Sequence, residues 1–203
     1  MALEFGIEKL TDRLGALAPS GFFFGLHIRY TQPLISQQTL PKAWIEHYIE
    51  EAYALRDPII AWGLSRVGTT RWSAIDIPDP FDILGQAHCH GLVYGLAVSC
   101  GPVKSRTIAT AARDDREFSD EEIAAFARII QLLHTMCEPP SSLTDAQTEA
   151  LRRIAEGDRH AAAAAKLGIS ESAFKARLSA ARSTLSARTT TEAIQKARDY
   201  RLL

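Results

Sequence analysis

The chain has 203 residues, of which 46% are apolar and 23% are charged, and its net charge is −1. This average composition excludes disordered, collagen-like and disulfide-scaffold proteins. The three cysteines are widely spaced and form no Cys-x-x-Cys pair, which favours reduced thiols over bridges or a zinc site. The longest apolar runs are too short to span a membrane and no signal-peptide pattern begins the chain, so we expect a cytoplasmic protein without a membrane partner.

The charges are distributed unevenly along the chain. Residues 1–140 carry 12 Lys or Arg against 17 Asp or Glu, a net of −5, whereas residues 141–203 carry 11 against 7, a net of +4. A basic segment that follows a larger acidic one indicates contact with nucleic acid.

The first part of the chain combines predicted helices and strands. Apolar periodicity, β-rich runs and helix caps predict, in chain order, a helix over Leu3–Leu17, a strand over Gly21–Tyr30, helices over Pro41–Ala54 and Pro58–Val67, strands over Leu92–Ser99 and Arg106–Ala112, and a helix from Ser119 to Cys137. Because helices and strands do not alternate strictly, we expect an α+β fold, an α/β/α sandwich around an antiparallel sheet.

A domain boundary is expected where the last of these helices ends. The stretch Glu138-Pro139-Pro140-Ser141-Ser142 places two prolines and two serines after a long helical pattern, and this composition breaks a helix. We therefore predict one domain over residues 1–138, a linker over residues 139–143 and a second domain over residues 144–203.

The predicted second domain is entirely helical. Four helices are expected, each after a capping residue: Thr144, Asp158, Ser170 and Thr189. The third helix covers Glu171 to about Leu185, and the turn before it is Gly168-Ile169-Ser170. A helix, a short glycine-containing turn and a second helix within about sixty residues are typical of a helix-turn-helix DNA-binding domain.

The third helix of this domain has two distinct faces. Phe174, Leu178, Ala181 and Leu185 form an apolar stripe that we expect to face the core. The opposite face offers small side chains that fit a major groove and cations that reach phosphates or bases: Ser172, Lys175, Ala176, Ser179 and Arg182. A solvated face without DNA is the alternative that this pattern leaves open.

The first domain contains a group of residues with complementary hydrogen-bonding functions. Trp44 and Tyr48 lie one helical turn apart and project side by side, and Asp57 and Trp72 follow them. An indole N–H, a phenol, a carboxylate and a flat aromatic wall complement a small lactone that carries an amide. The alternative is that the aromatic residues belong to the core and that Asp57-Pro58 only caps a helix.

A metal site or a catalytic nucleophile is not expected. His88-Cys89-His90 contains metal-ligating residue types, but neighbours on a helix diverge by about 100° and cannot meet at one ion. The same divergence argues against Cys89 as a nucleophile activated by His88. We therefore predict no metal, no cofactor and no enzymatic activity.

Two motifs together resemble a known family. The spacing Trp44-x3-Tyr48-x8-Asp57-Pro58, with Trp72 and Gly95 after it, resembles the autoinducer-binding domain of the LuxR-type quorum-sensing regulators. The stretch from Leu143-Thr144 to Leu167-Gly168-Ile169-Ser170 resembles the DNA-binding helix-turn-helix of the same family. The resemblance covers nearly the whole chain in the family's domain order.

The resemblance implies a transcriptional regulator that senses an N-acyl-homoserine lactone and binds a palindromic operator as a homodimer. By matching position, Trp44 would donate to the lactone carbonyl, Tyr48 would donate to the amide carbonyl, and Asp57 would accept from the amide N–H. Trp72 would pack near the lactone ring, and Thr110 would add a polar contact from a strand. The helices Ser119–Cys137 and Thr190–Arg201 are the expected dimer seam.

Two other interpretations stay open. Leu40 stands where family members often have a tyrosine, so one hydroxyl is missing from the expected site. In the second interpretation, the chain is a regulator of the same architecture that is ligand-independent, senses another small molecule or acts as an antagonist by heterodimerisation. An enzyme that acts on acylated small molecules is the third interpretation, and it requires a nucleophile or metal near Asp57 that the sequence does not offer.

Overall fold

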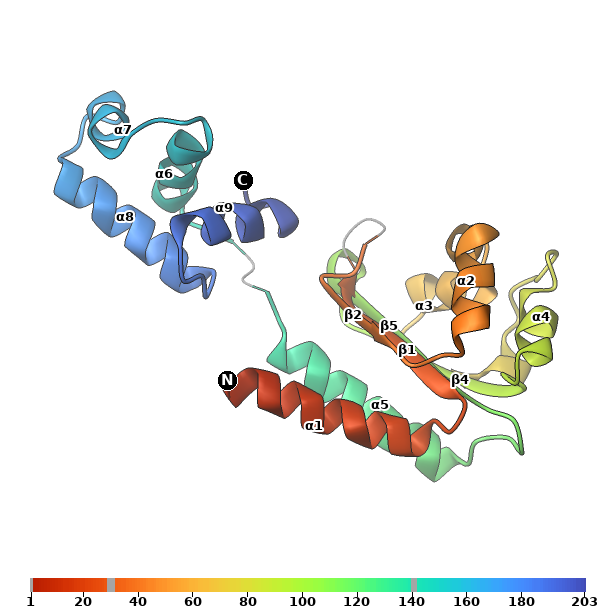
Figure 1. The fold of residues 1–203 in the computed structure, drawn as a ribbon. Coiled ribbons are helices and arrows are strands. Elements are labelled where there is room, and N and C mark those ends of the chain that lie inside the picture. Colours follow the sequence, from red (N-terminus) through yellow and green to blue (C-terminus); the bar gives the residue numbers. More distant parts are fainter. Residues whose placement is uncertain (1, 29–31, 140–141) are drawn as a thin grey trace. The chain divides into compact units, whose positions relative to one another are not determined.

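A computed structural model describes residues 2–28, 32–139 and 142–203 of the chain (Figure 1). The chain separates into two units, Met1–Glu138 and Pro139–Leu203, and each unit has its own apolar core. Residues 140 and 141 of the predicted linker lie outside the described residues.

The first unit contains helices and strands in a mixed order. Its elements are α1 (Ala2–Leu17), β1 (Gly21–Ile28), β2 (Ile35–Gln38), α2 (Lys42–Glu50), η1 (Tyr53–Leu55), α3 (Pro58–Ser65), β3 (Gly68–Arg71), η2 (Trp72–Ala74), α4 (Ile83–Cys89), β4 (Tyr94–Cys100), η3 (Val103–Ser105), β5 (Arg106–Arg113) and α5 (Asp120–Met136).

The strands form one antiparallel sheet with helices on both faces. The strand order is β2-β1-β5-β4-β3, and each neighbouring pair is antiparallel. Figure 1 shows α1 and α5 along one face of the sheet and α2, α3 and α4 on the other. The α+β class and the antiparallel sheet predicted from the sequence are confirmed.

Strand β1 separates two apolar cores. Its side chains alternate, so Phe22, Phe24 and Leu26 are completely buried in the core beneath α1 and α5. Phe23, between them, faces the opposite side of the sheet and lines a cavity there. The second core, on that side, contains Trp44, Trp62 and Trp72. The first unit therefore packs one face of its sheet solidly and keeps space over the other.

Several predicted boundaries in the first unit are wrong. The predicted helix Pro41–Ala54 is divided into α2 and η1, because Ala52 has a φ of 51° and a left-handed residue cannot continue a right-handed helix. The next helix ends at Ser65 rather than Val67, since Arg66 is extended. The end of the predicted strand Gly21–Tyr30 lies outside the described residues.

Three elements of the first unit carry no clear sequence signal. Strands β2 and β3 have four residues each and lie at the edges of the sheet, where β2 is exposed along its whole length. Exposed edge strands lack the alternation of apolar and polar residues that predicts a strand. Helix α4 has seven residues and is likewise absent from the predicted elements.

The second unit consists of α6 (Asp145–Ala155), α7 (His160–Lys166), α8 (Glu171–Thr184) and α9 (Thr190–Asp199). The predicted caps Thr144, Ser170 and Thr189 each accept a hydrogen bond from the backbone N–H three residues later. The predicted cap Asp158 is wrong: Arg159 precedes α7, and the Asp158 carboxylate pairs with the Lys166 ammonium at 2.6 Å.

The predicted apolar stripe, which runs along α8 to its C-cap Leu185, lies in the core of the second unit. Phe174, Leu178, Ala181 and Leu185 are at most 3% exposed and pack with small residues of the other helices, such as Ala150. The stripe is therefore confirmed. The last helix ends at Asp199 instead of Arg201, because Arg201 adopts a positive φ of 52°.

None of the helices in the described ranges combines the length and apolarity that a bilayer crossing requires.

The N-terminus of α5 is joined to the sheet through one carboxylate. Glu122 accepts from the Ser119 N–H at 2.8 Å in a capping box, and it also pairs with Arg116 at 2.8 Å and with Arg113 at 2.9 Å. Arg113 ends β5 and is buried. These hydrogen bonds, led by the one from Arg116, lower the pKa of Glu122 to about 2.

We expect Glu122→Gln to lower the free energy of unfolding at pH 6 by about 1 kcal/mol, after allowance for solvent screening. Because the folded pKa is depressed from 4.5 to about 2, the contribution of the carboxylate is fully present above pH 4.5. It is lost as the pH falls toward 2. Urea unfolding at a series of pH values measures the difference between variant and wild type, which should shrink over this interval. The assignment is contradicted if this difference in unfolding free energy stays constant down to pH 2. It is also contradicted if the exposed control Glu8→Gln shows the same change of the difference with pH.

Candidate ligand-binding pocket

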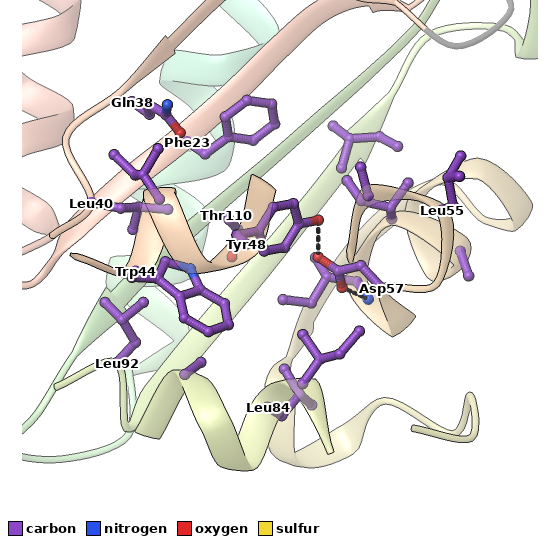
Figure 2. A pocket seen from close by; sticks show the side chains of 18 of the residues that line it. Phe23, Gln38, Leu40, Trp44, Tyr48, Leu55, Asp57, Leu84, Leu92 and Thr110 are labelled. Carbon is purple, nitrogen blue, oxygen red and sulfur yellow. Dashed lines mark hydrogen bonds between the residues drawn. The ribbon is translucent and has the colours of Figure 1, made fainter. Parts of the chain in front are cut away.

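A cavity of about 530 Å³ lies between the sheet and the helices α2, α3 and α4 of the first unit (Figure 2). This volume falls within the usual range for small-molecule sites. Its walls are mainly apolar, and its polar lining residues are Gln38, Trp44, Tyr48, Asp57, Trp72 and Thr110. Five of these six are the ligand-binding residues predicted from the sequence, so the fold brings all five to one cavity.

Helix α2 carries two of the six polar lining residues, Trp44 and Tyr48. Trp44 and Tyr48 lie one turn apart, with ring centroids 5.6 Å apart and planes at 65°. The Trp44 ring is 5% exposed and packs against Tyr53 and His90 on its other sides. Its indole N–H donates to none of the described residues, although Trp44 lines the cavity. An indole in this position is a donor without a partner among the described residues.

Asp57 connects α2 to α3 through both carboxylate oxygens. Oδ1 accepts from the Ile59 N–H at 2.7 Å and caps α3, whose first residue is Pro58. Oδ2 accepts from the Tyr48 hydroxyl at 2.7 Å (Figure 2). The helix-cap interpretation is therefore correct, and the same side chain also lines the cavity. A carboxylate has about four acceptor positions, so two oxygens engaged in this way retain capacity for a further donor.

The protonation of this pair follows from its burial. Burial raises the pKa of Asp57, and the hydrogen bonds from Tyr48 and from the α3 backbone oppose that rise. Burial also raises the pKa of Tyr48, as does the neighbouring Asp57 charge. Tyr48 consequently keeps its proton over the whole physiological range and acts as a donor.

Thr110 and Trp72 form a second polar pair on the sheet. The Trp72 indole N–H donates to Thr110 Oγ1 at 2.9 Å, and that hydroxyl donates to the Leu96 carbonyl at 2.8 Å. The Thr110 hydroxyl is thus engaged as both donor and acceptor. Thr110 orients the Trp72 ring in the cavity wall, and the polar ligand contact expected of it from the sequence stays a prediction.

The Trp72 ring rests against the backbone of β4. A Cβ atom added to Gly95 would lie 2.1 Å from atoms of the Trp72 ring, far inside contact distance. Gly95 is therefore required for the ring to lie flat on the sheet.

The apolar wall opens toward solvent at one side. Ile49, Leu55 and Leu64 line the cavity although they are 70%, 83% and 43% exposed. These residues come from α2, η1 and α3, so the opening lies between the helices.

Sequence analysis missed the sixth polar residue, Gln38, and most of the apolar wall. Gln38 lies on the edge strand β2, which has no detectable alternation. The apolar wall residues resemble ordinary core residues, so no local signal separates them from the core.

The residue types in the described lining of the cavity limit the chemistry that it can perform. Its described lining residues include no Ser, Cys, His or Lys. Across the described ranges, no three His, Cys, Asp or Glu side chains gather in a way that would hold a metal ion.

The predicted DNA-binding residues lie on α8 in the second unit. Ser172, Lys175, Ala176 and Ser179 are exposed on the side away from the core stripe, and Arg182 is partly buried. The Lys175 ammonium pairs with Glu171 at 2.7 Å across one helical turn. Four of the five residues therefore share one exposed helix face, and Arg182 is less accessible than they are.

Comparisons with known proteins identify relatives of this chain. The family described as autoinducer binding domain matches residues 7–137. The HTH-type quorum-sensing regulator RhlR of Pseudomonas aeruginosa is 29% identical over 185 residues, and the match covers 82% of this chain and 75% of RhlR. A crystal structure of Escherichia coli SdiA has a TM-score of 0.53 and 20% identity, covering 97% of this chain and 91% of SdiA. SdiA in complex with octanoyl-rac-glycerol has a TM-score of 0.52 and 19% identity, covering 97% of this chain and 87% of that one.

We expect Gly95→Ala to destabilise the first unit by about 1–3 kcal/mol, because the added methyl group displaces the Trp72 ring. Urea unfolding followed by tryptophan fluorescence measures the change and reports on the indole environment. Gly15→Ala is the matched control, since no atom beyond its chain neighbours and the backbone of its own helix lies within 4 Å of the added Cβ, and it should stabilise helix α1 by about 0.5–1 kcal/mol. Unaltered stability and fluorescence in Gly95→Ala would show that the ring does not depend on this glycine.

Proposed function

This chain belongs to the LuxR-type quorum-sensing regulators that carry an autoinducer-binding domain, and we propose that its cavity binds an N-acyl-homoserine lactone. We further propose that the second unit binds a palindromic DNA operator when the chain forms a homodimer. The observation that carries the ligand proposal is that the Trp44 N–H, which no described residue accepts, lies beside the Tyr48–Asp57 pair in one largely apolar cavity.

The Tyr48–Asp57 pair is suited to an amide group. An amide has an N–H donor and a carbonyl acceptor on adjacent atoms. When the amide N–H donates to Asp57, the Tyr48 hydroxyl is released from the carboxylate and donates to the amide carbonyl. One internal hydrogen bond is thereby exchanged for two hydrogen bonds to the ligand.

The remaining parts of the ligand have matching surfaces. The Trp44 N–H donates to the lactone carbonyl, and the Trp72 ring packs against the lactone ring. The acyl chain lies along the apolar wall, where Leu40 and Ile45 are among the lining residues. Burial of each methylene contributes about 0.8 kcal/mol, so the chain supplies much of the affinity.

A second candidate function rests on Leu40. It lines the cavity with an apolar side chain where family members often have a tyrosine, so the acyl carbonyl has one donor fewer. This favours a regulator that senses another small molecule or acts without a ligand, including as an antagonist through heterodimers. The cavity gives no comparable support to an enzyme, because its described lining includes no Ser, Cys, His or Lys and places no base beside a hydroxyl other than the Tyr48–Asp57 pair.

DNA binding is supported by the second unit. The glycine-containing turn between α7 and α8 precedes α8, whose exposed face carries Lys175 and Ser179. Residues 141–203 have a net charge of +4. A homodimer presents two such helices and matches a palindromic operator. Helices α5 and α9 are the proposed seam, and Leu132 of α5 is 47% exposed.

Ligand binding couples to the folded state by mass action. A ligand at a thousandfold excess over its Kd stabilises the folded form by about 4 kcal/mol. A stabilisation of this size is sufficient for the ligand-bound chain to stay folded and abundant while the ligand-free chain unfolds and is degraded.

Two substitutions test the site by titration calorimetry with an acyl-homoserine lactone. We expect Trp44→Phe to weaken binding about tenfold, because the ring is kept and only the N–H is lost. We expect Asp57→Asn to weaken binding about 10- to 100-fold. Asparagine still caps α3, but its NH₂ group opposes the amide N–H of the ligand.

Octanoylglycerol is the control ligand, because it has an acyl chain and no amide. Asp57→Asn should affect its binding much less than that of the lactone. Wild-type affinity in both variants contradicts the site assignment, and absence of lactone binding by the wild-type chain favours the second candidate function.

We expect Lys175→Ala to weaken binding to all DNA duplexes and to reduce the salt-dependence slope by about 1, as the loss of one phosphate contact predicts. Gel-shift titrations over a range of salt concentrations, with duplexes selected from a random pool, measure both quantities. Lys42→Ala removes an exposed lysine from α2 in the first unit and should leave them unchanged. Equal slopes in the two variants would argue against α8 as the DNA-contacting helix.

A further inference from the structure

One polar residue of the cavity has no role in the headgroup contacts described above. Besides the five predicted residues, Gln38 is the polar member of the described lining. Its carboxamide makes no hydrogen bond to the described residues, whereas Trp72 and Thr110 satisfy each other. A carboxamide presents two donors and an acceptor, so Gln38 offers both functions to a ligand.

The sheet register determines that Gln38 faces the cavity. Gln38 pairs with Phe23 and Gln37 pairs with Phe24 across strands β1 and β2. Residues that pair directly across two strands lie on the same face of the sheet. Phe23 lines the cavity and Phe24 is completely buried on the other face.

The neighbouring glutamine confirms this alternation. Gln37 Oε1 accepts a hydrogen bond from the Thr11 hydroxyl of α1 at 3.3 Å, on the face opposite the cavity. Two adjacent residues of the same type therefore point to opposite sides of one strand. Only Gln38 belongs to the cavity.

Gln38 lies on the side of the cavity away from Asp57 (Figure 2). Figure 2 shows it beside Phe23 and Leu40, on the other side of Tyr48 from Asp57. Its neighbours in the cavity wall, Phe23 and Leu40, are apolar. This part of the cavity therefore receives the acyl chain when the headgroup is bound by Trp44 and Asp57. A chain composed of methylenes alone gives the carboxamide no partner there.

We propose that Gln38 selects ligands whose acyl chain carries an oxygen substituent, either an oxo or a hydroxyl group. This inference rests on the proposed function and names the class of acyl chain within it. The Gln38 NH₂ group donates to an oxo oxygen, and its Oε1 accepts from a hydroxyl. Because Gln38 is also exposed to water, the gain is that of one neutral hydrogen bond, about two- to tenfold in affinity.

The test compares three lactones of equal chain length by titration calorimetry: the unsubstituted, the 3-oxo and the 3-hydroxy compounds. The wild-type chain should bind both oxygenated lactones about two- to tenfold more tightly than the unsubstituted one. Gln38→Leu should abolish this preference. Gln37→Leu, the matched control on the other face, should keep it.

Gln38→Glu separates a direct contact from a change of shape. A carboxylate only accepts hydrogen bonds, so this variant should keep the preference for the 3-hydroxy lactone and lose that for the 3-oxo lactone. It also retains the length of the side chain, which leaves the fold intact at this exposed edge strand.

Any one of three results would overturn the inference. Gln38 does not recognise the acyl chain if Gln38→Leu keeps the wild-type preference for the oxygenated lactones, if Gln38→Glu keeps the preference for the 3-oxo lactone, or if the wild type prefers the unsubstituted lactone. The proposed lactone function survives in that case, because the lactones still bind. Absence of binding by every lactone to the wild-type chain overturns the proposed function, and this inference with it.

Discussion

The hydrogen bond between Tyr48 and Asp57 is the contact on which the architecture of the cavity depends. A buried carboxylate is costly unless donors surround it, and here the donors come from α2 and from the first turn of α3. The same side chain thus fixes two helices relative to each other and presents acceptor capacity to the space between them. Structural and recognition roles coincide in one residue, so Asp57 serves as a helix cap and as a candidate ligand contact.

The sheet forms one wall of this space. Strand β1 places its fully buried phenylalanines against α1 and α5 and leaves Phe23 for the cavity. On β5 and β4, Thr110 and Gly95 hold the Trp72 ring flat. The cavity is therefore enclosed by side chains whose direction follows from strand alternation, while the helices on its other side supply the headgroup contacts and the apolar opening.

Sequence patterns were most informative where the interactions are local. Three of the four helix caps of the second unit and the core stripe of α8 depend on residues within a few positions of each other, and they were predicted correctly. The fourth predicted cap, Asp158, is wrong because Arg159 is the residue that precedes α7, and the Asp158 carboxylate pairs instead with Lys166, eight residues away. The edge strands β2 and β3 escaped prediction because exposed residues carry no periodic signal.

The sequence by itself determined the placement of Trp44 and Tyr48 on one side of a helix and of Asp57 at the start of the next, since both follow from helical period and capping chemistry. Only the tertiary structure decided that the Thr110 hydroxyl is engaged with Trp72 and Leu96, and that Gln38 rather than Gln37 faces the cavity. These outcomes depend on strand register, and a shift of one residue would send each side chain to the opposite face of the sheet.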